Sequence, residues 1–174
     1  LGRSPHRSIW KKSSKTDQEA VEWALDVTNS RVNENRMLHT LSGGERQKAY
    51  IAMALAQKTE TIILDEPTTY LDIAHQLDLL ELLKQLNETH GITILMVLHD
   101  LQQAAKYCDR LIAMKRGQVY QIGTPKEVLT ENFFKEVFGI QAEVHLDGEH
   151  PLIIPIASIQ QQKGDESNMI IVNN

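Results

Sequence analysis

The sequence predicts an α/β domain with a mostly parallel central sheet and a helical subdomain near the start of the chain. Two short apolar runs, residues 61–64 and 92–98, have the length and composition of buried strands, and the second is expected to be covered on both faces. A helical pattern that begins at Asp72 separates these runs, and such alternation favours parallel strands joined by crossover helices. Ahead of the first run, apolar residues recur at helical spacing, which predicts the helical subdomain.

Composition limits the classes of protein to which the chain could belong. Its 174 residues suffice for a domain with its own core, and 41% hydrophobic with 24% charged residues is ordinary for a soluble globular protein. A net charge of −5 argues against nucleic acid as a main partner. We expect no signal peptide, and the sequence has no run of the roughly 18–20 apolar residues that span a bilayer. The single cysteine, Cys108, excludes an internal disulfide and fits a reducing compartment. We therefore expect a cytoplasmic protein.

Residues 41–45, Leu-Ser-Gly-Gly-Glu, are the first candidate for a binding site. Ser42 and Glu45 form an S-x-x-E capping box, with Ser42 as the N-cap of a helix. Gly43 and Gly44 then occupy the first two helical positions, where glycine costs about 1 kcal/mol each relative to alanine. An anion, most often a phosphate, could use the bare backbone N–H groups at the positive end of this helix. Taken alone, the same residues also fit a plain loop that enters a helix.

The first predicted strand ends in two carboxylates, Asp65 and Glu66, followed by Pro67. Ligands of open α/β sheets bind at the carboxyl ends of strands, which is where these side chains are expected. One carboxylate could hold Mg²⁺ through its water shell while the other orients an attacking water. The alternative is an ordinary solvated strand end.

Two further segments follow in an informative order. Residues 68–72 come directly after the paired carboxylates, and His99 with Asp100 closes the second apolar run. With the signature stretch at 41–45, these motifs resemble the ATP-binding subunit of an ABC transporter over residues 2–138. The resemblance implies the C-terminal part of a P-loop NTPase domain, because the sequence has no G-x-x-x-x-G-K-[ST] phosphate loop. We expect that loop to precede Leu1 in a longer ATPase, and this chain alone to be inactive.

The resemblance also implies a role for each motif residue. Ser42, Gly43, Gly44 and Glu45 would bind the γ-phosphate of an ATP held by a second subunit. Asp72 would couple the two composite sites, although its position also explains it as a helix N-cap.

Three residues would carry the hydrolysis. Asp65 would hold Mg²⁺ mostly through water, and Glu66 would polarise the water that attacks the γ-phosphorus. His99 would contact the γ-phosphate, whereas a lone histidine after a strand is otherwise more often structural.

The family further implies the cofactors, partners and location. ATP and Mg²⁺ would be bound by an ATPase dimer that drives membrane-embedded permease subunits, and a substrate-binding protein would take part indirectly. The protein would sit on the cytoplasmic face of the membrane as a peripheral subunit. We expect a helical signature subdomain at 1–57, a catalytic α/β core at 58–140, and a small β unit with a polar tail at 141–174.

Local patterns predict several further elements. Thr16 and Glu19 indicate a capping box for the first helix, and residues 110–122 indicate a hairpin. A small β unit is expected around residues 144–156, followed by a polar, mobile tail from Gln160. The helix after Asp72 is expected to bury a face formed by Ile73, Leu77, Leu80 and Leu83.

The cargo is the least determined property. Residues 72–76, 97–100, 104–109, 123–125 and 138–140 resemble the subgroup that serves ferric-siderophore importers. Importers of haem, vitamin B12 or metal ions have related ATPases and stay open. So do a soluble ABC ATPase of DNA repair or translation, and a regulatory module without hydrolysis. The presence of both Glu66 and His99 argues against the last.

Overall fold

The computed structural model describes residues 14–146, 148–159 and 169–173. The chain divides into two compact units, each considered by itself below. Residues 1–62 and 68–92 form the first unit, and residues 63–67 and 93–174 form the second. The polar start of the chain and residues 160–168 of the expected tail lie outside the described residues. The subdomain boundaries expected at 57/58 and 140/141 stay predictions.

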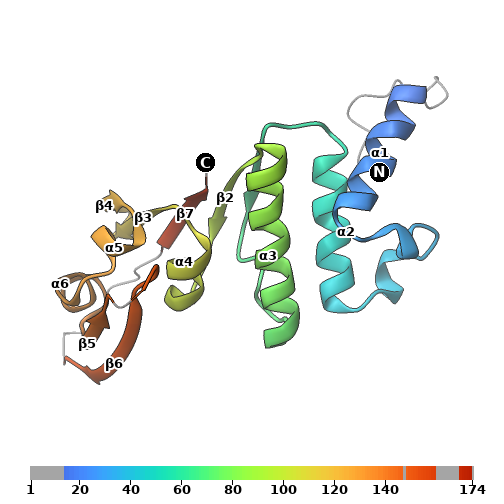
Figure 1. Ribbon diagram of the computed structural model, residues 1–174. Coiled ribbons are helices and arrows are strands. Elements are labelled where there is room, and N and C mark those ends of the chain that lie inside the picture. Colours follow the sequence, from blue (N-terminus) through green and yellow to red (C-terminus); the bar gives the residue numbers. More distant parts are fainter. Residues whose placement is uncertain (1–13, 147, 160–168, 174) are drawn as a thin grey trace. The chain divides into compact units, whose positions relative to one another are not determined.

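The first unit is helical (Figure 1). α1 (Lys15–Val27) packs against α2 (Gly43–Leu55), and α2 packs against α3 (Ile73–His90). Two short 3₁₀ helices, η2 (Arg31–Asn33) and η3 (Leu38–Thr40), connect α1 to α2. Small or aliphatic side chains from the first two helices are buried between them, namely Ala20, Ala24, Ile51, Ala52 and Leu55.

The first helix begins earlier than the sequence predicted. Ser14 is the N-cap, and its hydroxyl accepts a hydrogen bond from the Asp17 amide at 3.1 Å. The Asp17 carboxylate accepts the Ser14 amide in return at 3.1 Å. The prediction of a box formed by Thr16 and Glu19 was therefore wrong. Asp17 is buried and Glu19 is exposed. The buried Asp17, and not Glu19, therefore supplies the carboxylate of the capping box.

α3 begins at the predicted N-cap, Asp72, and ends where Gly91 adopts a left-handed conformation with φ 64°. Its buried face differs from the predicted one, because Ile73 is 75% exposed and Leu77 is 38% exposed. Burial begins only after the second turn, so the apolar side chains of the first turns remain in solvent. The buried face consists of leucines, namely Leu79, Leu80, Leu82, Leu83 and Leu86.

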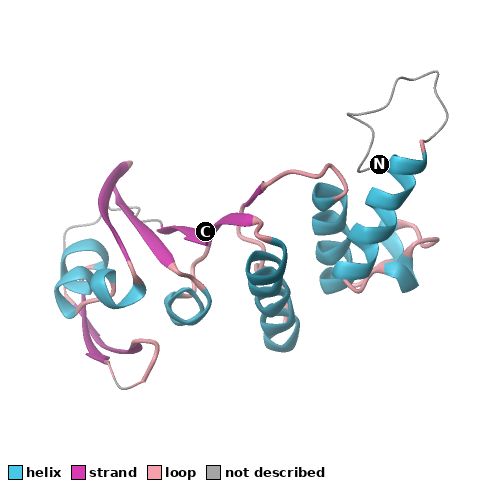
Figure 2. Ribbon diagram, turned by 45° about the horizontal axis from the view of Figure 1, so that its top comes forward, coloured by secondary structure: helices cyan, strands magenta, loops and turns pink. Residues whose placement is uncertain are grey.

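The second unit contains most of a five-stranded sheet, and strands are magenta in Figure 2. The strand order in this sheet is β1-β2-β7-β3-β4. These strands are β1 (Thr61–Leu64), β2 (Thr93–Val97), β7 (Met169–Asn173), β3 (Arg110–Lys115) and β4 (Gln118–Gly123). The α/β class is confirmed, but β7 pairs antiparallel with both β2 and β3, and β3 pairs antiparallel with β4. The sheet is thus less parallel than expected, because a hairpin and a C-terminal strand contribute to it.

Two strands are less covered than the sequence predicted. β1 is the edge strand of the sheet formed by the described residues. In it only Ile62 is buried, and Ile63 is 73% exposed. In β2 burial alternates, with Ile94 and Met96 buried and Leu95 half-buried, whereas the sequence predicted cover on both faces. Both strands therefore have one well-covered face.

The rest of the second unit follows the predicted order closely. The β3–β4 turn has positive φ at Arg116 and Gly117, as a two-residue hairpin requires. α4 (Leu101–Tyr107) precedes β3, and α5 (Pro125–Val128), α6 (Glu131–Phe133) and a π-helical turn (Phe134–Phe138) follow β4. The predicted β unit is a longer antiparallel hairpin of β5 (Ile140–His145) and β6 (Leu152–Ser158). Within the described ranges, no helix has the length and apolar character to cross a bilayer.

Candidate nucleotide-binding site

The capping box at the start of α2 is confirmed. The Glu45 amide donates to the Ser42 hydroxyl at 3.3 Å, and the Ser42 amide donates to the Glu45 carboxylate at 2.9 Å. The hydrogen bond from the Ser42 amide, followed by one from the Ser42 side chain, holds the pKa of the Glu45 carboxyl below its usual value. The turn is therefore fixed while Ser42 and Gly43 remain exposed and Gly44 is buried.

Two further residues support this turn and were not predicted. Asn33 donates its amide to Glu45 Oε1 at 3.3 Å, and Arg36 donates Nη1 to the same oxygen at 3.2 Å. Arg36 also donates Nη2 to the Thr40 carbonyl at 2.7 Å. Both residues lie in the irregular segment between α1 and α2, where no periodicity could have indicated their partners.

α2 offers a helix N-terminus suited to an anion. The amides at the start of a helix have no intrahelical acceptor, and the aligned peptide dipoles make this end positive. Gly43 and Gly44, which have no side chains of their own, occupy the first two positions of this helix. The arrangement can bind a phosphate group, as the sequence predicted, and the binding itself stays a prediction.

Glu66 and His99 lie together at the ends of two neighbouring strands. Glu66 follows β1, His99 follows β2, and these strands are adjacent in the sheet. His99 Nε2 lies 2.6 Å from Glu66 Oε1, with 60% of the His99 side chain and 39% of the Glu66 side chain exposed. The sequence predicted each residue separately, and the structure adds their direct contact.

The backbone at Glu66 is in an unusual conformation. Its φ of 46° lies in the left-handed region, which non-glycine residues seldom adopt. Such conformations cost roughly 1–3 kcal/mol and cluster at functional sites, where the surrounding structure holds them. Glu66 holds this conformation while its carboxylate contacts His99, a combination that an ordinary solvated strand end does not require.

Asp65 is exposed beside Glu66 and is the candidate ligand for Mg²⁺. Within the described part of the chain, no three His, Cys, Asp or Glu side chains gather closely enough to hold a metal ion. Mg²⁺ is commonly bound by one or two carboxylates together with substrate phosphates and water. A single carboxylate at this position fits that mode of binding.

Asp72 lies in the first unit, as do residues 42–45, which we call the signature turn. Its Oδ1 accepts the His75 backbone amide at 3.0 Å, and its Oδ2 lies 2.7 Å from His75 Nδ1. The bond from the His75 amide, followed by that from the His75 ring, lowers the pKa of Asp72. The carboxylate therefore caps α3, as predicted. Its coupling role stays a prediction.

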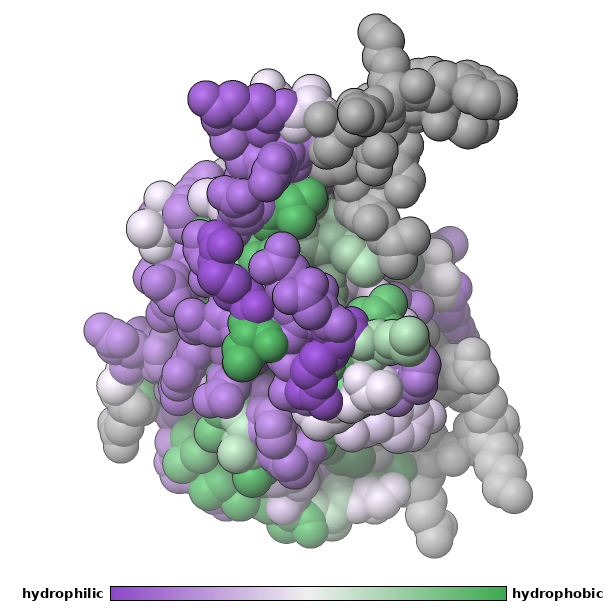
Figure 3. Space-filling view, turned by 90° about the vertical axis from the view of Figure 1, so that its right-hand side faces the viewer, coloured by the Kyte–Doolittle hydropathy of each residue, from purple (hydrophilic) through white to green (hydrophobic). Residues whose placement is uncertain are grey.

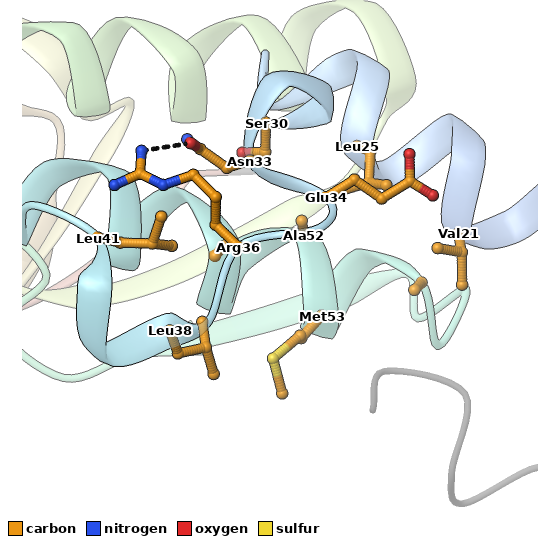
Figure 4. Close-up of a pocket in the computed structure, with 12 residues that line it drawn as sticks. Val21, Leu25, Ser30, Asn33, Glu34, Arg36, Leu38, Leu41, Ala52 and Met53 are labelled. Carbon is orange, nitrogen blue, oxygen red and sulfur yellow. Dashed lines mark hydrogen bonds between the residues drawn. The ribbon is translucent and has the colours of Figure 1, made fainter.

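A cavity of about 260 Å³ lies beside the signature helix in the first unit (Figure 4). Its apolar lining comes from α1, α2 and the segment between them, and includes Val21, Leu25, Leu38, Leu41 and Met53. Arg36 and Asn33, joined by a 2.9 Å hydrogen bond, lie at its polar side. The face that carries α1 and α2 is otherwise mainly hydrophilic, with small apolar patches (Figure 3).

Known proteins are similar to this chain over most of its length. The ABC transporter family profile matches residues 3–69. The petrobactin import ATP-binding protein FpuC of Bacillus anthracis is 53% identical over 155 residues, which are 89% of this chain and 57% of the relative. This chain belongs to the ABC transporter ATP-binding family. The iron(3+)-hydroxamate import ATP-binding protein FhuC of Bacillus subtilis is 49% identical, over 84% of this chain and 54% of the relative.

Solved ABC transporter structures share the fold. A chain described as a metal-chelate type ABC transporter, in an inward-facing conformation, matches with a TM-score of 0.78 at 28% identity, covering 89% of this chain and 64% of its own. A dimeric ATP-binding cassette bound to ADP and Pi matches with a TM-score of 0.55 at 30% identity, covering 69% of this chain and 52% of its own. The part of this ABC ATP-binding chain that matches FpuC covers about 57% of the length of FpuC.

Proposed function

We propose that this chain is part of the ATP-binding and hydrolysing subunit of an ABC importer whose cargo is a ferric siderophore. The observation that carries the proposal is the 2.6 Å contact between His99 Nε2 and Glu66 Oε1. This contact brings a carboxylate and an imidazole together at the carboxyl ends of β1 and β2, where both could contact a water and a γ-phosphate. The similarity to FpuC, a petrobactin import protein, and to FhuC, an iron(3+)-hydroxamate import protein, supports the siderophore cargo over haem, vitamin B12 or metal ions.

In the proposed mechanism, Glu66 is the base that polarises the attacking water. An ionised carboxylate only accepts hydrogen bonds, so the Nε2–H group of His99 donates a hydrogen bond to Glu66 in this arrangement. That bond orients both side chains before the nucleotide arrives, which lowers the reorganisation needed for reaction. His99 then lies beside the water and can contact the γ-phosphate. Asp65 would hold Mg²⁺ through water, and the ion would neutralise charge on the β- and γ-phosphates.

The signature turn serves a second subunit in this proposal. Ser42, Gly43 and Gly44 would bind the γ-phosphate of an ATP held by the phosphate loop of a twin molecule, and Glu45 would keep the turn in shape. Asp72 would couple the two nucleotide sites. The likeness to a dimeric cassette with ADP and Pi supports this arrangement. Closing of the dimer on ATP and its opening after hydrolysis would drive the permease.

The proposed partners are permease subunits at the cytoplasmic face of the membrane, with a substrate-binding protein acting through them. The helical subdomain at 1–57 would face the permease, residues 58–140 would form the catalytic core, and residues 141–174 the C-terminal unit. We further propose that the 174-residue chain does not hydrolyse ATP by itself, since its sequence contains no phosphate loop.

Uptake and hydrolysis assays test this function directly. In a strain that lacks the gene, the full-length protein should restore uptake of radiolabelled ferric hydroxamate, and it should hydrolyse ATP when purified. The 174-residue chain alone should release no more phosphate than its own Glu66→Gln variant. Unchanged uptake in the deletion strain would eliminate the siderophore cargo. Turnover by the 174-residue chain above its control would contradict the proposed inactivity.

Substitutions at the N-caps of α1 and α2 distinguish an effect on stability from an effect on nucleotide binding. Ser42→Ala and Ser14→Ala each remove an N-cap hydroxyl, and each should lower the free energy of unfolding by about 1 kcal/mol. Only Ser42→Ala should weaken ATP-dependent dimerisation of the full-length protein, because Ser14 caps a helix outside the proposed site. Urea unfolding and sedimentation velocity with ATP measure the two effects. Equal loss of dimer in both variants would remove Ser42 from nucleotide binding.

A further inference from the structure

The second signature glycine lies against the side chain of His75. A Cβ added at Gly44 would lie 2.5 Å from His75 Cδ2 and 3.1 Å from His75 Cγ. The same addition at Gly43 would meet only Leu71 Cδ2 at 3.4 Å, which is an ordinary contact. The imidazole therefore fills the space that an alanine methyl would need at Gly44, and leaves that space open at Gly43.

A hydrogen bond on the other side of the same ring holds it in place. His75 Nδ1 lies 2.7 Å from Asp72 Oδ2. Because an ionised carboxylate can only accept, Nδ1 carries the proton and donates it. Nδ1 and Cδ2 are the two ring atoms bonded to Cγ, so the ring has Asp72 on one side and Gly44 on the other. One side chain thus bridges the start of α3 and the start of α2.

Helix capping alone does not account for this bridge. The cap of α3 is already complete when Asp72 Oδ1 accepts the His75 backbone amide at 3.0 Å. The second carboxylate oxygen binds the imidazole in addition, although 45% of the His75 side chain is exposed and could be hydrated instead. Ordering an exposed side chain costs conformational entropy, so a ring fixed between two site residues indicates a use beyond the cap.

We propose that His75 is a positioning residue that couples Asp72 to the Gly43–Gly44 amides of the signature turn. The inference rests on the function proposed above, in which those amides bind a γ-phosphate. When Asp72 moves, the ring moves with it, and the backbone at Gly44 that contacts the ring must follow. Glycine at this position then serves the close approach of the imidazole, in addition to leaving an amide accessible.

Three substitutions in the full-length protein, alone and combined, test the contact. Gly44→Ala should lower the thermal midpoint by several degrees, because the methyl displaces the ring. His75→Ala should recover most of that loss in the double variant, since the obstructing ring is gone. Gly43→Ala is the matched control, and His75→Ala should not recover its loss. Additive losses in the Gly44 pair, or equal recovery in the Gly43 pair, would overturn the bridge.

Steady-state kinetics test the positioning role. His75→Ala should raise KM for ATP about 10-fold with little change in kcat, as expected when ground-state and transition-state contacts are weakened equally. His75→Asn, whose amide can still donate to Asp72, should stay within about 2-fold of the parent KM, and His75→Leu should behave like His75→Ala. An unchanged KM for His75→Ala, or identical values for Asn and Leu, would refute the proposal.

The two readouts separate this inference from the proposed function. If the full-length parent fails to hydrolyse ATP, the proposed function fails, and the positioning role fails with it. The thermal cycle of Gly44 and His75 then still decides whether the bridge exists. If the parent hydrolyses ATP and the thermal cycle is additive, the proposed function stands and the bridge alone is wrong.

Discussion

Replacing Glu66 with glutamine is expected to leave ATP binding intact while lowering the hydrolysis rate of the full-length protein about 1,000-fold. An amide has nearly the same shape as the carboxylate but cannot take a proton from the attacking water, and a general base contributes roughly 100- to 10,000-fold. Because a glutamine amide can still bond to His99, the geometry at the strand edge should persist. Phosphate release under single-turnover conditions measures the rate, and nucleotide retention measures the binding.

A matched control for this substitution lies one residue before the same strand. Glu60→Gln makes the identical chemical change at an exposed position that precedes β1, whereas Glu66 follows it. The control should hydrolyse ATP at the parent rate. If Glu66→Gln also does so, Glu66 is not the base, and the proposed mechanism loses its central residue. If binding disappears together with hydrolysis, the effect is on the fold rather than on the chemistry.

Motifs formed by residues close together in the sequence were predicted correctly. The Ser42–Glu45 box, the Asp72 cap and the hairpin turn at residues 116–117 depend on residues within one turn of each other, and all three formed as predicted. The start of α1 shows the limit of such signals. Ser14 with Asp17 and Thr16 with Glu19 fit the same pattern, and only burial of Asp17 distinguishes them.

Properties that depend on distant parts of the chain were missed. β7 forms from residues expected to be a mobile tail, because its order comes from pairing with β2 and β3 and not from its own pattern. The exposure of Ile63 depends on what packs on its face of the sheet, which an apolar run cannot reveal. The same holds within the candidate site. The contacts of Glu66 with His99 and of His75 with Gly44 arise only when separate elements meet.

Removing His99 is expected to lower the hydrolysis rate about 100-fold, and to add little when Glu66 is already glutamine. The reason is the hydrogen bond between the two side chains, which makes them act as one unit towards the attacking water. Without the imidazole, the Glu66 carboxylate keeps its charge but loses a partner that fixes its direction. Single-turnover rates for His99→Ala, Glu66→Gln and the double variant define the cycle.

A second histidine–glutamate pair in the same unit provides the control for this cycle. His145 Nε2 lies 3.5 Å from Glu143 Oε2 on β5, and both side chains are about half exposed, as at the candidate site. His145→Ala should leave hydrolysis unchanged, because that pair belongs to the separate two-stranded sheet of β5 and β6, whereas Glu66 and His99 follow β1 and β2. Multiplicative losses in the Glu66–His99 cycle would show that the two residues act independently. In that case the 2.6 Å contact would be structural, and His99 would act on the phosphate alone.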